Sequence, residues 1–149
     1  MEIERKFLIK NLPKNLDSYQ YHDIEQAYLC TSPVIRIRRQ DNEYILTYKS
    51  PGMMVRDEYN LPLTKTAYLH LKEKTDGNVI SKKRYIIPLE NGLKIELDLF
   101  HPPFQELIVA EVEFPSVESA NEFDPPSWFA QDVTFNPEYH NSHLSKLKI

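Results

Sequence analysis

The chain has 149 residues and a formal net charge of −4, with 41% hydrophobic and 27% charged side chains. This length suits one domain with a buried core, and we expect a single domain over residues 1–149. The acidic balance argues against a protein that coats nucleic acid, because that role needs an overall basic surface. No segment has the run of about 18 apolar residues that a membrane-spanning helix needs. The N-terminus has no apolar stretch typical of a secretory signal and Cys30 is the only cysteine, so we expect a cytoplasmic protein without disulfides.

The first half of the chain alternates between apolar and polar side chains, which is the pattern of strands. Between residues 34 and 40, Arg36 and Arg38 share one face, and the isoleucines beside them share the other. Turn-forming residues, such as Asp41-Asn42, separate the alternating segments. The expected strands cover residues 2–9, 23–31, 34–40, 43–50 and 53–61.

The second half begins with a change of period. Apolar residues recur at helical spacing over residues 63–74, where Thr64 or Thr66 can cap a helix. Asp76-Gly77-Asn78 predicts a turn. Further strands are expected over residues 79–89, 93–100 and 107–114, and further helices over 116–123, capped by Ser116, and over about 138–147.

Eight strands joined mostly by tight turns predict a mainly β (α+β) fold with an antiparallel sheet, which can close into a barrel. Charged side chains gather on one face of most of these strands. If that face met water, Glu2, Arg38, Lys82 and Glu111 would be exposed. We favour the inverse arrangement, because the apolar faces of the two middle helices need an apolar surface to cover, which the strands supply. The charges also occur as repeated blocks such as Glu-x-Glu and Arg-x-Arg.

An interior with this many charges must be wet, paired or built for a charged ligand, since a buried unpaired charge is very costly. Arginine and lysine suit phosphate oxygens. Carboxylates in the same cavity would repel a polyanion unless a hard divalent cation such as Mg²⁺ lies between them. The mixture therefore predicts metal-assisted phosphoryl chemistry.

The ordered blocks resemble the CYTH superfamily, the triphosphate tunnel metalloenzymes, and in particular their small bacterial tripolyphosphatases. The resemblance begins at Glu2-x-Glu4-x-Lys6 and extends to about Phe114. It implies a closed eight-stranded antiparallel barrel with a charged interior, short helices outside it, and bound Mg²⁺ or Mn²⁺. The metal ligands it implies are Glu2, Glu4 and a carboxylate of the last strand, Glu111 or Glu113. The implied phosphate ligands are Lys6, Arg36, Arg38, Lys49, Arg56, Lys82 and Arg84, and the implied catalytic residues are Glu4, Lys6, Glu58, Lys82 and Asp98.

We accordingly expect hydrolysis of inorganic tripolyphosphate to pyrophosphate and phosphate. Three alternatives stay open: hydrolysis of ATP or thiamine triphosphate, cyclisation of ATP, and binding of polyphosphate without catalysis. The expected partner is a triphosphate, with no nucleic acid and no membrane, and a homodimer stays open. His140-x-x-His143 has one-turn spacing, but without a third ligand nearby we expect exposed helix histidines. Cys30 has no partner base and is expected to be a buried thiol.

Overall fold

The computed structural model of the protein describes residues 1–148. Strands dominate this part of the chain, and the helices are short. The strands are β1 (Glu2–Ile9), β2 (Gln20–Thr31), β3 (Val34–Gln40), β4 (Glu43–Lys49), β5 (Val55–Arg56), β6 (Glu58–Leu63), β7 (Asp76–Pro88), β8 (Lys94–Phe100), β9 (Ile108–Glu113) and β10 (Phe129–Asp132). The α-helices are α1 (Lys65–Lys72), α2 (Val117–Glu122) and α3 (Asn141–Leu144), and the 3₁₀ helices are η1 (Leu16–Ser18), η2 (Glu90–Gly92) and η3 (Pro137–Tyr139). None of the helices in residues 1–148 has the length and apolar character needed to cross a bilayer.

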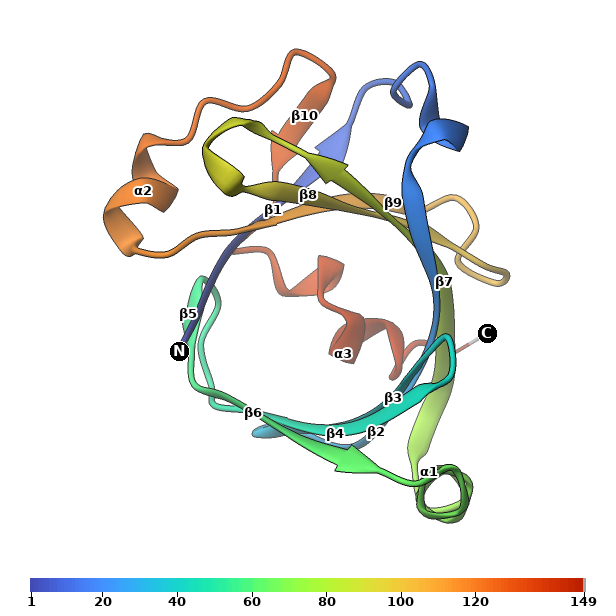
Figure 1. The fold of residues 1–149 in the computed structure, drawn as a ribbon. Helices are drawn as coiled ribbons and strands as arrows, with labels where there is room; N and C mark the ends of the chain where they lie inside the picture. The colour runs from blue at the N-terminus through green and yellow to red at the C-terminus, as the bar shows by residue number, and fades with distance from the viewer. Residues whose placement is uncertain (149) are drawn as a thin grey trace.

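The strands form one antiparallel sheet in the order β10-β1-β9-β8-β7-β2-β3-β4-β6, and β5 pairs with β1 to bring the two ends of the barrel wall together (Figure 1). The expected antiparallel barrel is thus confirmed. The segment predicted as one strand over residues 53–61 is divided at Asp57: β6 pairs with β4, whereas β5 turns to pair with β1. The wall therefore contains nine strands, and β10 extends the sheet beyond the end of β1.

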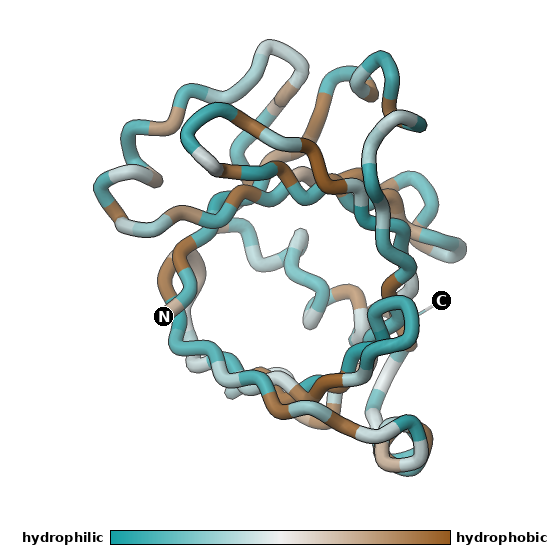
Figure 2. Tube along the Cα trace, viewed as in Figure 1, coloured by the Kyte–Doolittle hydropathy of each residue, from teal (hydrophilic) through white to brown (hydrophobic). Residues whose placement is uncertain are grey.

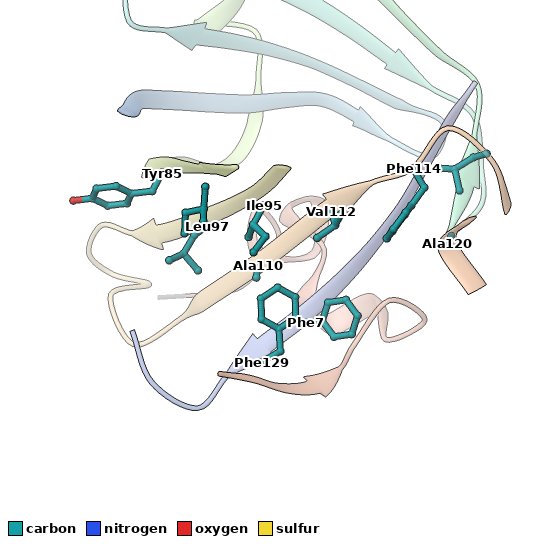
Figure 3. Close-up of a cluster of buried hydrophobic side chains, with 11 residues drawn as sticks. Phe7, Tyr85, Ile95, Leu97, Ala110, Val112, Phe114, Ala120 and Phe129 are labelled. Carbon is teal, nitrogen blue, oxygen red and sulfur yellow. The ribbon is translucent and has the colours of Figure 1, made fainter. Parts of the chain in front are cut away.

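Most of the apolar core lies outside the barrel, against its outer surface. The largest cluster covers the outer faces of β1, β7, β8 and β9, with residues from α2 and β10 packed over them (Figure 3). Phe7 and Phe129, for example, have ring centroids 4.9 Å apart. Figure 2 shows the alternation of apolar and polar residues along the wall. The inner face is charged and shielded from solvent, since Glu2, Lys82 and Glu111 are only 8%, 1% and 7% exposed. The alternative with an apolar interior is wrong.

Two of the predicted helices form with the predicted caps. The Thr64 hydroxyl accepts a hydrogen bond from the backbone N–H of Ala67 at 3.1 Å, which starts α1. Ser116 forms a capping box with Ser119 at the start of α2. Tyr68 of α1 is buried and donates a hydrogen bond to Glu25, which fixes the helix on the outside of the wall.

Other expectations are wrong, for local reasons. Asp76-Gly77-Asn78 belongs to β7 because the turn occurs earlier, at residues 73–74. The C-terminal helix shortens to η3 and α3, and α3 crosses one end of the barrel instead of lying outside its wall (Figure 1). The structure adds β10, which carries too short an alternation to be recognised in the sequence. Cys30 is exposed, because a register shift in β2 beside it turns its side chain outward.

Candidate functional site

A cavity of about 160 Å³ fills the middle of the barrel, and each of the nine strands of the wall contributes at least one side chain to it. All predicted site residues line this cavity except Asp98. The lining residues are Glu2, Glu4, Lys6, Tyr28, Val34, Arg36, Arg38, Lys49, Arg56, Glu58, Lys82, Arg84, Glu96, Glu111, Glu113, His140, Asn141 and Ser142.

The strand register explains how blocks that are distant in sequence meet. In the antiparallel pair β1–β9, Glu4 lies opposite Glu113 and Lys6 lies opposite Glu111. On the other side of β9, Glu96 of β8 lies opposite Glu111. Residues two apart on a strand share a face, so each Glu-x-Glu block turns both of its carboxylates toward the cavity, where Glu113, at the end of β9, is exposed.

Four of the cavity cations are held by carboxylates. Lys49 contacts Glu2 at 2.9 Å, and Lys6 contacts Glu111 at 3.6 Å. Lys82 contacts Asp98 at 2.8 Å. Arg84 spans Asp98 with two hydrogen bonds of 2.7 and 2.9 Å, in the bidentate geometry that suits a guanidinium.

Asp98 is 0% exposed and lies behind Lys82 and Arg84, outside the lining of the cavity. Although burial raises the pKa of a carboxyl, the charges of Arg84 and Lys82 hold the pKa of Asp98 below its ordinary value. Asp98 is therefore a charged support for two cations.

Three guanidiniums differ from these cations. Arg36, Arg38 and Arg56 have no carboxylate partner among residues 1–148, and the Nε atom of each is buried without a hydrogen-bond partner. Burial and the charges of Arg36 and Arg84 lower the pKa of Arg38 to about 9. Buried donors without acceptors are costly, so this group is suited to an anion that fills the cavity.

Two carboxylates are also without a cation partner. Glu4 and Glu113 face each other across the β1–β9 pair, and neither forms a salt bridge within residues 1–148. Burial and the charge of Glu111 raise the pKa of Glu4 to about 7. Burial and the charges of Glu2 and Glu58 raise the pKa of Glu113. Like charges directly opposite each other repel, and a bound cation would relieve the repulsion.

The end of the barrel crossed by α3 adds residues that we did not predict for the site. Asn141 accepts hydrogen bonds from Lys82 and Gln26, each at 3.0 Å. Burial, reinforced by the charge of Lys6, lowers the pKa of His140 to about 4. His140 lines the cavity while His143 does not, and both are half-buried, so the prediction of two exposed helix histidines is wrong.

Comparisons with known proteins match nearly the whole of the chain and its fold. A sequence model of the CYTH domain matches residues 1–148. The chain is a member of the CYTH family. It is 38% identical to an inorganic triphosphatase of Nitrosomonas europaea over 97% of this chain and 96% of that protein. An inorganic triphosphatase of Acetivibrio thermocellus is 30% identical over 97% and 93% of the two chains. A crystal structure of an inorganic triphosphatase superposes with a TM-score of 0.71 at 35% identity, covering 97% and 94% of the chains.

The acidic side chains of this CYTH domain fit a divalent cation that is shared with a ligand. Among residues 1–148, no three Asp, Glu, His or Cys side chains converge closely enough to hold an ion alone. Mg²⁺ is typically held by one or two carboxylates together with substrate phosphates and water. Glu4 and Glu113 supply two such carboxylates, and the pKa of each is raised by burial and by neighbouring negative charge, which a bound cation would offset.

Six lining residues of the CYTH domain were absent from the predicted site. Glu96 belongs to an acidic block visible in the sequence, and its alternation with Asp98 was the signal for it. Val34 shares a strand face with Arg36 and Arg38, and Tyr28 lies opposite Arg36, but neither side chain is a charged group of the kind that defined the predicted site. The three residues of the C-terminal segment enter the site only because α3 crosses the barrel end. The unpredicted lining residues are Tyr28, Val34, Glu96, His140, Asn141 and Ser142.

Proposed function

We propose that this CYTH domain is a divalent-metal-dependent triphosphatase that hydrolyses inorganic tripolyphosphate to pyrophosphate and phosphate. The observation that carries the proposal is a set of three guanidiniums without carboxylate partners, Arg36, Arg38 and Arg56, each with a buried Nε that has no acceptor. They line a cavity that also holds the unpaired Glu4 and Glu113. A polyphosphate anion would satisfy the guanidiniums, and a cation would satisfy the carboxylates. The names of two relatives that match along nearly the whole chain support the same activity.

The composition of the cavity favours an inorganic substrate. Tyr28 and Val34 are the apolar or aromatic side chains in the lining, and Tyr28 is 2% exposed. A nucleobase or thiazole ring needs an aromatic or apolar surface on which to pack. This cavity instead surrounds its contents with charged and amide groups, which suit phosphate on every side.

The metal in this proposal is Mg²⁺ or Mn²⁺. Glu4 and Glu113 would hold it, with Glu2 and Glu111 beside them, and oxygen ligands of this kind suit both ions. When bound, the ion supplies Lewis-acid polarisation of a phosphoryl oxygen and offsets its negative charge.

The protein's own residues bind and orient the substrate. Arg36, Arg38 and Arg56 donate hydrogen bonds to phosphate oxygens. Lys6, Lys49 and Arg84 add positive charge while their carboxylate partners hold them in place. Asp98 holds Lys82, which adds positive charge only once its amine has taken up a proton. Charge that grows on the phosphate oxygens in the transition state is stabilised by this fixed array, which needs little reorganisation.

Lys82 is the group in this proposal that takes the proton of the attacking water. Burial lowers the pKa of Lys82 to about 7, so its amine is partly neutral near neutral pH. Water oxygen bonds to the terminal phosphorus, the bridging P–O bond breaks, pyrophosphate leaves, and the proton passes to the Lys82 amine. Glu58 lines the same cavity and stays ionised. Burial opposes its ionisation, but a hydrogen bond with Glu2 and the charge of Lys49 lower the pKa of Glu58 to about 2.

The test is an assay of phosphate release from tripolyphosphate, ATP and thiamine triphosphate, with Mg²⁺, with Mn²⁺ and with chelator. We expect turnover of tripolyphosphate with metal, far slower release from the organic triphosphates, and none with chelator. Glu118→Gln, which changes an exposed carboxylate on α2, is the matched control and should match the wild type. Tight binding of tripolyphosphate without metal-stimulated release of phosphate would contradict the enzymatic function and favour a polyphosphate-binding module. Faster phosphate release from ATP or thiamine triphosphate than from tripolyphosphate would contradict the proposed substrate.

A further inference from the structure

Asn141, the first residue of α3, joins two parts of the cavity through one oxygen atom. Its Oδ1 accepts hydrogen bonds from Lys82 Nζ and from Gln26 Nε2, both at 3.0 Å. Arg38 has only donors and occupies the Gln26 oxygen, so Gln26 turns its N–H toward Asn141, whose side-chain amide must present its oxygen here. Both lone pairs of that oxygen are therefore occupied.

Gln26 extends this connection to a third strand. It is fully buried in β2, and its own Oε1 accepts a hydrogen bond from Arg38 Nη2 at 3.1 Å. One continuous path of hydrogen bonds thus runs from Lys82 on β7 through Asn141 and Gln26 to Arg38 on β3. Its two ends are cations of the proposed triphosphate site.

The segment that carries Asn141 is fixed to the strand that carries Lys82. The Asn78 side chain donates to the carbonyl oxygens of Leu144 and Leu147 at 3.0 and 2.6 Å, and its backbone N–H donates to Ser145 at 2.7 Å. Gly77 has a φ of +73°, and a side-chain carbon there would collide with the Ser145 carbonyl oxygen. Leu144 is buried in an apolar cluster beneath the barrel end. The close packing of α3 on β7 fixes the distance from Asn141 to Lys82.

Resting on the proposed triphosphatase activity, we propose that Asn141 is a positioning residue: its side-chain oxygen fixes the Lys82 amine and, through Gln26, the Arg38 guanidinium. The amide is neutral, so it orients Lys82 without adding a charge. The charged groups that act on Lys82 are Asp98 of β8, Arg84 of the same strand, Glu111 of β9 and Arg38 of β3. A carboxylate in place of Asn141 would be a further negative charge in contact with the amine.

The test compares Asn141→Ala, Asn141→Asp and the control His143→Ala, which lies on α3 outside the cavity lining. Asn141→Ala should lower kcat for tripolyphosphate by about 10- to 100-fold at every pH, with a much smaller change in KM. Asn141→Asp keeps an acceptor oxygen for both donors, so it should recover most of kcat at high pH. Its acid limb should move up by about one pH unit, because a nearby carboxylate favours the ammonium form of Lys82. His143→Ala should change neither quantity.

The result that overturns the proposal is a wild-type kcat in Asn141→Ala, or an equal loss in both Asn141 variants at every pH, which a purely structural role produces. A second measurement does not depend on catalysis: the ¹³Cε NMR signal of Lys82, titrated without substrate. The midpoint of this titration should rise in Asn141→Asp. An unchanged midpoint would show that the side chain at position 141 does not contact the Lys82 amine in solution. Absence of tripolyphosphate hydrolysis by the wild type would overturn the proposed function, while this titration would still decide the role of Asn141.

Discussion

Two sets of carboxylates face the same barrel interior, and their pKa values move in opposite directions. Asp98 and Glu111 contact cations, and the pKa of each is lowered although burial opposes ionisation. Glu4 and Glu113 have no cation partner among residues 1–148, and the pKa of each is raised, first by burial. The difference separates carboxylates that hold the protein's own cations from carboxylates that remain available to an external cation.

The cations divide in the same way. Arg84 and Lys82 are satisfied by Asp98, whereas Arg36 and Arg56 keep buried donors without acceptors. The paired groups hold one another in place without any ligand, and the unpaired groups define what the interior can bind. The kind of ligand that a charged cavity binds is therefore inferred from the charges that lack partners, and less from the total number of charges.

The sharpest test of the unpaired set is Glu4→Gln. Removing this carboxylate should lower the rate of phosphate release from tripolyphosphate by at least about 10³-fold, because the cation loses a charged ligand. Circular dichroism should show an intact fold. Unchanged phosphate release would contradict the role of Glu4.

The same variant should stabilise the metal-free protein at neutral pH. The pKa of Glu4 is raised from 4.5 to about 7, so the unfolded chain loses this proton before the folded protein does. The contribution of Glu4 to the free energy of unfolding therefore falls as pH rises from about 4.5 to about 7. Thermal melts in chelator should show Glu4→Gln more stable than wild type at pH 8 and equal to it near pH 4.

The paired set is tested by Asp98→Asn, which leaves Lys82 and Arg84 buried without their shared counter-charge. The free energy of unfolding should fall by roughly 3 kcal/mol, the low end for breaking a buried ion pair, because asparagine retains one acceptor oxygen. Denaturant titration measures the change. The matched variant is Glu113→Gln, which removes an unpaired carboxylate and should not destabilise the protein. Equal destabilisation by both substitutions would contradict the division into cation-paired and unpaired carboxylates.

Among the cations, Arg36→Met removes an unpaired guanidinium and keeps much of its apolar volume. Affinity for tripolyphosphate should fall by about 10- to 100-fold, the range for hydrogen bonds to a charged group. The melting temperature should stay the same or rise, since a buried donor without an acceptor disappears. Calorimetric titration and a thermal melt give both values. A lower melting temperature with unchanged affinity would show that Arg36 has a structural partner in solution.

The smallest expected effect is the number of protons that the protein releases when it binds a metal ion. Metal binding requires ionised carboxylates, and at about pH 6 most of the Glu4 population is still protonated because its pKa is about 7. Adding Mn²⁺ at that pH should release close to one proton per protein, measured with an indicator dye. At about pH 8.5 the release should be much smaller. Glu4→Gln should release fewer protons at the lower pH, and equal release would place the titrating group elsewhere.

The strands and the inward orientation of their charged side chains could be predicted from the sequence. A period of two fixes the face of every side chain on a strand once one face is known. Hence Glu2, Arg38 and Lys82 could be assigned to the interior. The position of Asp98 behind the cavity was not visible, since Glu96 and Asp98 share a face and differ only in depth along the barrel. Depth depends on strand tilt and on the partner strand, which the alternation does not encode.

The C-terminal segment was the least predictable part of the site. Asn141 belongs to a helix of four residues, too short for a periodic signal, and its function depends on contacts with β7 more than 50 residues earlier in the chain. The division of the predicted strand at Asp57 had a similar cause. That residue marks a change of pairing partner between β4 and β1, which is a property of barrel closure and not of local composition.

The junction of β5 with β1 also has a kinetic consequence. The two strands pair through Glu2–Arg56 and Ile3–Val55, with one more backbone hydrogen bond from Glu4 to Met54 at 3.0 Å. This junction is the shortest seam in the wall, so its amides should exchange with deuterium sooner than those of the long β2–β7 ladder. Arg56 and Lys6 line the cavity from opposite sides of the seam. A triphosphate that binds both residues would hold β5 and β1 together. The backbone amides of residues 54–56 should then exchange with deuterium more slowly when substrate is bound.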